Sequence, residues 1–334
     1  MPRANRVYSN NSVYEIVPRA REHLPMPPNA TTNEIRLGIL GRTQRDNKVE
    51  LCHFVDMNNH SHSIAVSTEL DKLSKFHMEI KKKTTDAVKA LLRLSTLSLW
   101  EDRTGVIRVT TLEDVIERIV YLYCNPSNAS LCESIDQYPG LSSWDAFKEC
   151  QPAIDAEIML DAQWYPVSEI PQLPASCSLT PKQDAALYRE LKHSEKACKH
   201  PVVLKPFKWL ETFGVTDSRE IEKIRQRIIS RVREHEHANT LARERTHKTS
   251  VSRAALERER FMKPHKPKKK GRKIFLICSD TELRISLIES FKRTVSRCKE
   301  CYHLAKAGMR VEWPPGTFIP WFPPGFVFPL PLHA

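Results

Sequence analysis

Two histidines separated by one residue, His60 and His62, are the side chains of this sequence best suited to binding a divalent ion. The preceding Asn58-Asn59 favours a turn, and residues 60–66 have the composition of a strand. Successive side chains of a strand point to opposite faces, so both imidazoles lie on one side with Cβ atoms roughly 6.6 Å apart. An isolated pair of this kind is commonly a solvated surface pair, so the metal hypothesis needs a partner elsewhere in the chain.

Tyr121 and Asn125 provide that partner. They lie on a helix that we expect to begin after Thr111, which opens a pattern like a capping box, and to stop at Pro126. Two side chains four residues apart on a helix are offset by about 40° around the axis and roughly 6 Å along it, so they share a face. Tyr121 falls on the polar side of this helix, whereas Tyr123 borders its apolar stripe. We therefore expect Tyr121 to be reactive and Tyr123 to belong to the core.

These residue types suggest chemistry on a phosphodiester. A phenol with a pKa of about 10 is a weak nucleophile, and the charge of the phosphodiester repels an attacking anion. A divalent ion bound by His60 and His62 would neutralise the phosphate and orient it for in-line displacement. Asn125 would add a third ligand or orient the phosphate. Tyr121 would then attack phosphorus, giving a covalent phosphotyrosine link and a free 3′-OH that can reverse the reaction without ATP.

The elements that position these residues follow the order β-α-β-β-α-β-α through residue 125. Hydrophobic periodicity and turn residues predict strands at 11–17, 48–57, 60–66 and 106–110, and helices at 33–45, 70–94 and 111–125. This order predicts an α+β fold, with a ferredoxin-like antiparallel sheet that carries helices on one face.

Five segments of the first half form a specific set in this order and spacing: residues 1–6, 13–16, 57–62, 100–103 and 120–126. Together they resemble the REP-associated tyrosine transposases, a group within the single-tyrosine HUH transposases. The resemblance covers about residues 1–148. It implies a ferredoxin-like catalytic domain, a divalent Mg or Mn ion, single-stranded DNA near short hairpins as the substrate, and a homodimer.

Carried over residue by residue, the resemblance assigns His60 and His62 to metal binding and Tyr121 to the nucleophile. Asn125 matches the polar residue four positions after that tyrosine. Two departures stand against this pattern: Ser61 replaces a residue that is usually bulky and apolar, and the short Pro-rich segment after the first strand lacks the usual histidine- and arginine-bearing sequence. These departures leave open a catalytically decayed or domesticated copy that binds hairpin DNA on the same fold.

The net charge of +12 is concentrated in one tract of the chain. Residues 221–273 hold 18 Lys and Arg against 6 acidic residues, so the remainder is neutral. Such a tract favours a polyanionic partner held through phosphate contacts, although a solvated linker is the alternative for residues 263–273. The residues expected to bind DNA are Lys81, Lys82, Lys83, Arg103, Lys268, Lys269, Lys270 and Arg272.

The length of 334 residues predicts two units, a catalytic domain at 1–148 and a helical, basic region at 149–334. Within the second unit we expect a helix opened by Thr180-Pro181 and a long helix with an apolar stripe from Ile221 to Val232. A strand at 273–278 follows, and Ser279 then caps a further helix. The chain ends in a segment rich in proline and aromatic residues.

The composition also indicates the cellular compartment of the protein. No run of eighteen uncharged apolar residues occurs, and the N-terminus lacks the apolar stretch of a secretion signal. We therefore expect a soluble, cytoplasmic protein with no membrane partner. Nine cysteines without framework spacing fit a reducing environment, and the close pair Cys298 and Cys301 is interpreted as two thiols on a helix.

Three functions stay open at this point. The first is an active enzyme that transfers DNA strands, and the second is a non-catalytic DNA-binding protein on the same fold. The third is a metal-dependent hydrolase with a water nucleophile, which is disfavoured because two histidines without nearby carboxylates make a sparse hydrolytic site.

Overall fold

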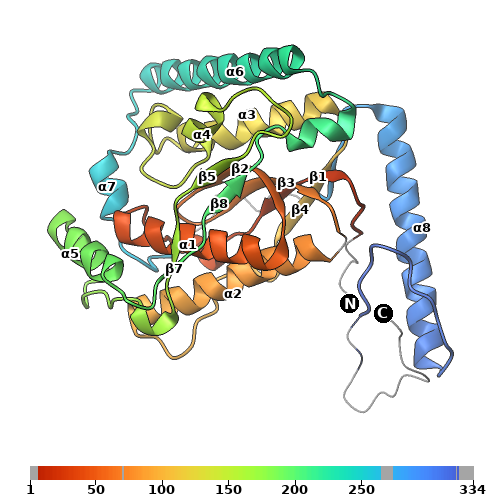
Figure 1. The fold of residues 1–334 in the computed structure, drawn as a ribbon, viewed down its shortest axis with the longest axis horizontal. Coiled ribbons are helices and arrows are strands. Elements are labelled where there is room, and N and C mark those ends of the chain that lie inside the picture. Colours follow the sequence, from red (N-terminus) through yellow and green to blue (C-terminus); the bar gives the residue numbers. More distant parts are fainter. Residues whose placement is uncertain (1–6, 70, 265–273, 321, 323–334) are drawn as a thin grey trace.

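The computed structural model describes residues 7–69, 71–264, 274–320 and 322 (Figure 1). Its first half contains β1 (Ser12–Val17), η1 (Arg21–His23), α1 (Ala30–Asn47), β2 (Glu50–Asp56), β3 (Ser61–Ser67), α2 (Lys72–Leu92), β4 (Gly105–Val109) and α3 (Leu112–Asn128). Apart from the short turn η1, this is the predicted order β-α-β-β-α-β-α. The α+β class is confirmed.

The second half contains short strands and longer helices. Its elements are η2 (Ile135–Gln137), α4 (Trp144–Glu149), β5 (Ile158–Leu160), β6 (Gln163–Trp164), η3 (Val167–Glu169), α5 (Pro181–Lys192), β7 (Cys198–Lys199), β8 (Val202–Leu204), η4 (Lys208–Phe213), α6 (Ser218–Arg245), α7 (Arg253–Glu257), β9 (Leu276–Ile277) and α8 (Thr281–Lys306). In the described ranges, no helix is both long enough and apolar enough to cross a membrane.

Seven of the described strands form one mixed sheet in the order β5-β8-β2-β3-β1-β4-β9. The strands of the first half are antiparallel neighbours at its centre, where Glu15 of β1 faces Ile64 of β3 and Ile107 of β4. The edges come from the second half, since β8 pairs with β2 and β9 with β4, both in parallel. The antiparallel sheet expected from the sequence is thus the centre of a larger mixed sheet.

Helices cover both faces of this sheet (Figure 1), so the expectation of helices on one face is wrong. The helices α1 and α2 lie on one face, and α3, α4 and α6 lie on the other. The reason is visible in β1, which is buried along its whole length. Val13 packs on the α3 side, whereas Tyr14 and Ile16 pack on the α2 side. A strand that is apolar on both faces needs a covering layer on each.

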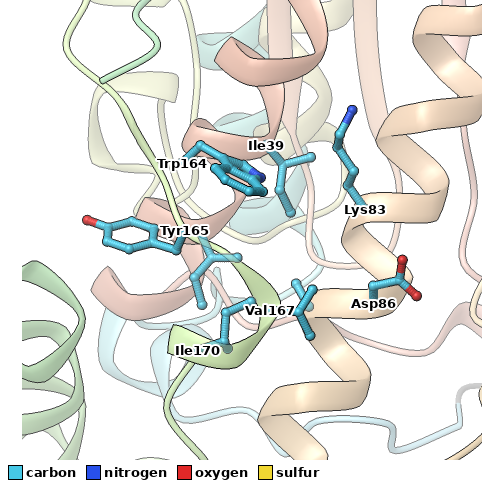
Figure 2. Close-up of a pocket in the computed structure, with 9 residues that line it drawn as sticks. Ile39, Lys83, Asp86, Trp164, Tyr165, Val167 and Ile170 are labelled. Atoms are coloured by element: carbon cyan, nitrogen blue, oxygen red, sulfur yellow. The ribbon is translucent and has the colours of Figure 1, made fainter. Parts of the chain in front are cut away.

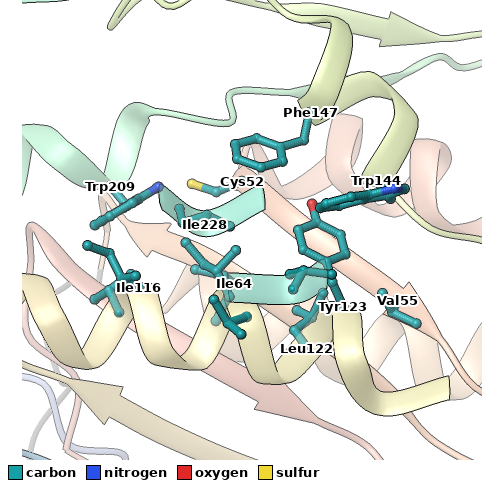
Figure 3. Packing of buried hydrophobic residues seen from close by; sticks show 14 of the residues in the cluster. Cys52, Val55, Ile64, Ile116, Leu122, Tyr123, Trp144, Phe147, Trp209 and Ile228 are labelled. Carbon is teal, nitrogen blue, oxygen red and sulfur yellow. The ribbon is translucent and has the colours of Figure 1, made fainter. Parts of the chain in front are cut away.

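The larger core cluster lies between α3 and the sheet (Figure 3). It joins both halves of the chain: Cys52 and Ile64 come from the central strands, Tyr123 from α3, and Trp209 and Ile228 from η4 and α6. The second half therefore packs as part of the same sheet and core.

Two helix ends differ from the predictions. The helix α3 runs through Pro126 to Asn128, because α6 holds its last turn: Asn239 donates to Asn128 at 2.7 Å and Arg243 donates to the carbonyl of Ser127 at 3.0 Å. The cap of α8 is Asp280 and not Ser279. The Ser279 backbone N–H instead donates to Asp114 at the start of α3, at 2.8 Å. In both places a tertiary contact outweighs the local signal.

Of the strand expected at 273–278, residue 273 lies outside the described residues, and residues 274–278 contain only the two-residue strand β9, whose side chains are half-buried. By contrast, Thr180 caps α5 as predicted. Its hydroxyl accepts from the N–H of Gln183, whose side chain accepts from Thr180, which completes a capping box.

Two glycines of α1 allow the second half to lie directly on this helix. A Cβ atom at Gly38 would overlap the carbonyl oxygen of Gln163, and one at Gly41 would overlap the carbonyl oxygen of His200. These glycines are required for the close approach of β6 and β7, which explains their presence inside a helix despite the low helix propensity of glycine.

The substitution Gly41→Ala is expected to destabilise the protein by about 1–3 kcal/mol, because the added methyl group forces α1 away from the backbone at His200. Urea unfolding measures this effect. The matched control is Gly105→Ala in β4, where the nearest atom to the new Cβ is 3.5 Å away, and a change below about 0.5 kcal/mol is expected. Equal stabilities of the two variants would contradict the packing argument.

A small hollow lies between α1, α2 and the segment after β6 (Figure 2). Its lining is mainly apolar, with Ile35, Ile39 and Trp164 inside and Lys83 and Asp86 on α2. Its volume is about 60 Å³. Ligand pockets are commonly several times larger, at about 300–1,000 Å³, so this hollow is a packing gap and not the functional site.

Candidate active site

The structure brings Tyr121 next to His60 and His62, from which it is far apart in the sequence. The ring centroids of His60 and His62 lie 5.0 Å apart, and those of His62 and Tyr121 lie 5.8 Å apart. The two histidines lie at the start of β3, where His60 also forms a backbone bridge with Arg19. Two imidazoles and a phenol thus meet where β3 faces α3.

The two tyrosines of α3 have opposite environments. Tyr121 is 39% exposed, and the guanidinium of Arg118 lies over its ring at 4.3 Å. Tyr123 is fully buried, and its hydroxyl contacts His53 Nδ1 at 2.8 Å and Ser143 Oγ at 2.9 Å. Burial raises the pKa of Tyr123 well above its ordinary value. The prediction that Tyr123 belongs to the core is confirmed.

Glu15 of β1 links the two sides of the site. Its carboxylate is fully buried and accepts from His62 Nδ1 at 2.8 Å and from Arg118 Nε and Nη2 at 2.9 and 2.7 Å. Burial acts to raise the pKa of Glu15, but the hydrogen bond from His62 and the charge and hydrogen bonds of Arg118 outweigh it and hold this pKa below its ordinary value. The carboxylate is therefore ionised and acts only as an acceptor.

The free ring nitrogen of His62 tests whether the site suits a metal ion. Nδ1 is engaged with the Glu15 carboxylate, so Nε2 is the ring nitrogen left for a ligand, and this buried nitrogen has no hydrogen-bond partner among the described residues. A buried polar nitrogen without a partner is costly, and a histidine fixed by a carboxylate is a common metal ligand. His62 therefore fits a cation.

His60 and Asn125 are the other two residues that the sequence predicts as metal ligands. His60 Nδ1 lies 2.7 Å from Asn59 Oδ1, and burial, together with neighbouring positive charges, lowers the pKa of His60 well below its ordinary value, so the imidazole is neutral. Asn125, one turn after Tyr121 on α3, is buried, and its side-chain nitrogen has no partner in the described part of the chain. Since the amide oxygen and nitrogen of Asn exchange places on a flip, this group can offer an oxygen.

Within the described ranges, no group of three or more His, Cys, Asp or Glu side chains is arranged to hold a metal ion. A cation at His60 and His62 would therefore need Asn125 or substrate oxygens as further ligands. Two imidazoles with open positions for phosphate oxygens suit an ion that acts on the substrate and not a closed structural site.

The residues expected to bind DNA have varied surroundings. Lys82 is exposed and Arg103 is half-buried, whereas Lys81 donates to the carbonyl of Glu101 at 2.9 Å and Lys83 pairs with Glu79 and with Asp46. The segment around Trp100 forms a bridge with Ala20, next to the Arg19–His60 bridge. Arg103 thus follows a segment adjacent to the histidines, and Lys81 of α2 contacts that segment at Glu101. Lys268, Lys269, Lys270 and Arg272 lie outside the described residues.

Many arginines of the basic helix α6 bind the protein itself. Arg227 and Arg231 pair with Glu113 of α3 at 2.6 and 3.0 Å, and Arg243 pairs with Glu133 at 2.9 Å. The first two ion pairs join α6 to α3 and the third joins it to the segment after α3, so fewer charges of α6 are left for a polyanion than the sequence suggested.

Sequence reasoning missed the parts played by Glu15 and Arg118. A signal for Glu15 existed, since it is a single carboxylate inside an otherwise apolar strand and shares the face of Val13. Arg118 precedes Tyr121 by one helical turn, a spacing that places both on one face.

The comparisons with known proteins add little to this geometry. No protein-family model and no curated protein matches the chain. A solved structure of a REP-associated tyrosine transposase bound to a REP hairpin is similar at 20% identity over 44% of this chain and 84% of that chain, with a TM-score of 0.37. A likeness of this size does not assign the chain to a family, so any function has to be argued from the site itself.

Proposed function

We propose that this protein cleaves and rejoins single-stranded DNA near hairpins through a 5′-phosphotyrosine intermediate on Tyr121. The observation that supports this most is the meeting of an exposed phenol with two imidazoles, one of which has a buried nitrogen without a partner among the described residues. A hydrolase with a water nucleophile does not require an exposed tyrosine whose ring centroid lies 5.8 Å from that of a metal-binding histidine.

The roles of the residues follow from their positions. His60 and His62, with Asn125 as a further donor, would hold a divalent Mg or Mn ion, which when bound supplies charge neutralisation for a phosphate. Tyr121 attacks phosphorus, the bond from phosphorus to the 3′ oxygen breaks, and that oxygen takes up a proton. The 3′-OH can later attack the phosphotyrosine in the reverse direction, so rejoining needs no external energy source.

Arg118 supports the nucleophile in this scheme. Its guanidinium lies over the Tyr121 ring and is held there by Glu15. A cation at the face of an aromatic ring interacts favourably with its electrons, and it favours the negative charge that develops on the phenol as the proton leaves.

The test uses a single-stranded oligonucleotide that contains a short hairpin and carries a label at its 3′ end. The label must be at this end because the 5′ phosphate of the downstream fragment is the one that stays on the tyrosine. Incubation of the full chain with Mn²⁺ is expected to give a labelled protein band that survives denaturation. An oligonucleotide of equal length without a hairpin is the control.

The result separates the competing functions. Tight hairpin binding without an adduct would favour the non-catalytic DNA-binding protein, which is the alternative function on this fold. Cleavage without an adduct would indicate a water nucleophile instead of Tyr121.

A further inference from the structure

We propose that Glu15 is the positioning residue of this site, which sets the metal-binding form of His62 and the place of Arg118 over Tyr121 at the same time. This role rests on the function proposed above. It is argued from the contacts of one buried carboxylate with both sides of the site.

The first contact orients His62. Glu15 and His62 lie on the neighbouring antiparallel strands β1 and β3, and the carboxylate accepts from Nδ1 at 2.8 Å. Glu15 also accepts two hydrogen bonds from Arg118, so it is the acceptor in this contact: the hydrogen lies on Nδ1, and Nε2 is the ring nitrogen left to bind a metal ion. Without Glu15, a neutral imidazole would also populate the form with the proton on Nε2, which has no lone pair on that nitrogen for a metal ion.

The second contact orients Arg118. Its Nε and Nη2 atoms both donate to Glu15, so the plane of the guanidinium is fixed by two hydrogen bonds. The same group lies 4.3 Å from the centre of the Tyr121 ring. One carboxylate of the sheet therefore fixes the metal side and the nucleophile side relative to each other.

The pattern of satisfied and unsatisfied groups argues against a purely structural ion pair. A buried ion pair that serves stability alone would leave its partners fully hydrogen-bonded. Here the carboxylate has partners on both oxygens, whereas the second nitrogen of its histidine partner has none among the described residues. The network is complete except at the atom that would contact a cation.

The test measures Mn²⁺ affinity of the full chain without DNA, from the electron paramagnetic resonance signal of free Mn²⁺. Glu15→Gln is expected to weaken binding by about 10–100-fold, the effect typical of losing the carboxylate behind a metal-binding histidine. The matched control is Glu236→Gln. Glu236 is also buried, and it accepts from the N–H of Ile135 and pairs with Arg233, but it lies on α6. Its replacement is expected to leave Mn²⁺ affinity unchanged.

A second measurement uses wild-type protein, so it does not depend on whether a variant folds. Nitrogen-15 spectra of the metal-free wild-type protein report which ring nitrogen of His62 carries hydrogen, and we expect it on Nδ1. Hydrogen on Nε2 would overturn the proposal, as would Glu15→Gln protein that binds Mn²⁺ as tightly as wild type. Wild-type protein that binds no Mn²⁺ would overturn the metal site of the proposed function, and the role of Glu15 with it. Failure of the Glu15 proposal alone can thus be distinguished from failure of the proposed function.

Discussion

Tyr121→Phe is expected to abolish the covalent adduct with DNA, a loss of at least about 10³-fold, because only the phenolic oxygen can form the bond to phosphorus. The ring stays in place under Arg118, and the lost hydroxyl belongs to a side chain that is 39% exposed. The free energy of unfolding should therefore change by less than about 0.5 kcal/mol. Denaturing gels with the 3′-labelled hairpin measure the adduct, and urea unfolding measures the stability.

The matched control is Tyr123→Phe, two residues along the same helix. This change removes a buried hydroxyl that contacts His53 and Ser143, so it should cost about 1–3 kcal/mol of stability while the adduct remains. The two tyrosines are thus expected to show opposite profiles. If the adduct persists in the Tyr121 variant, or is lost in a folded Tyr123 variant, then the assignment of Tyr121 as the nucleophile is wrong.

Removal of the metal site has the second largest expected effect. His60→Ala and His62→Ala should each reduce adduct formation by at least about 100-fold, because the charge of the phosphate is then no longer neutralised. EDTA should have the same effect on wild-type protein, and added Mn²⁺ should reverse it. His193→Ala, which removes an exposed histidine after α5, is the control and should change nothing.

Mixing two inactive variants tests whether the site is built within one chain. The ring centroids of His62 and Tyr121 in the same chain lie 5.8 Å apart. A mixture of His62→Ala and Tyr121→Phe proteins is therefore expected to stay inactive. Recovery of the adduct in the mixture would show that a tyrosine from a second copy acts instead. Adduct formation in EDTA would contradict the metal role itself.

The parts of the site that sequence reasoning found are those set by local geometry. The spacing of His60 and His62 on a strand, and the position of Tyr121 on the polar side of a helix, depend on side-chain periodicity alone. The structure places these three residues together, while their chemical roles stay predictions. Tyr123 was assigned to the core by the same periodicity, and the structure agrees.

What could not be predicted depends on contacts between distant segments. The role of Glu15 depends on its hydrogen bonds with His62 and Arg118, and no local sequence pattern predicts which partners a buried carboxylate will have. The continuation of α3 past Pro126 depends on Arg243 of α6. Helices on both faces of the sheet were missed because strands such as β1 are apolar on both sides, a pattern that does not alternate.

The pairing of β2 with β8 has a consequence for how the protein is made. On one side β2 pairs with β3, but its other neighbour, β8, is translated much later, and α6 follows later still. Ribosomes add about 5–20 residues per second, so roughly 7–30 s separate the synthesis of β2 from that of β8. During this interval the newly made half has an open strand edge and an uncovered face of α3. His60, His62 and Tyr121 are all translated before α6, the helix that packs on α3. A nascent chain therefore carries His60, His62 and Tyr121 before it has the second-half elements that pack on α3.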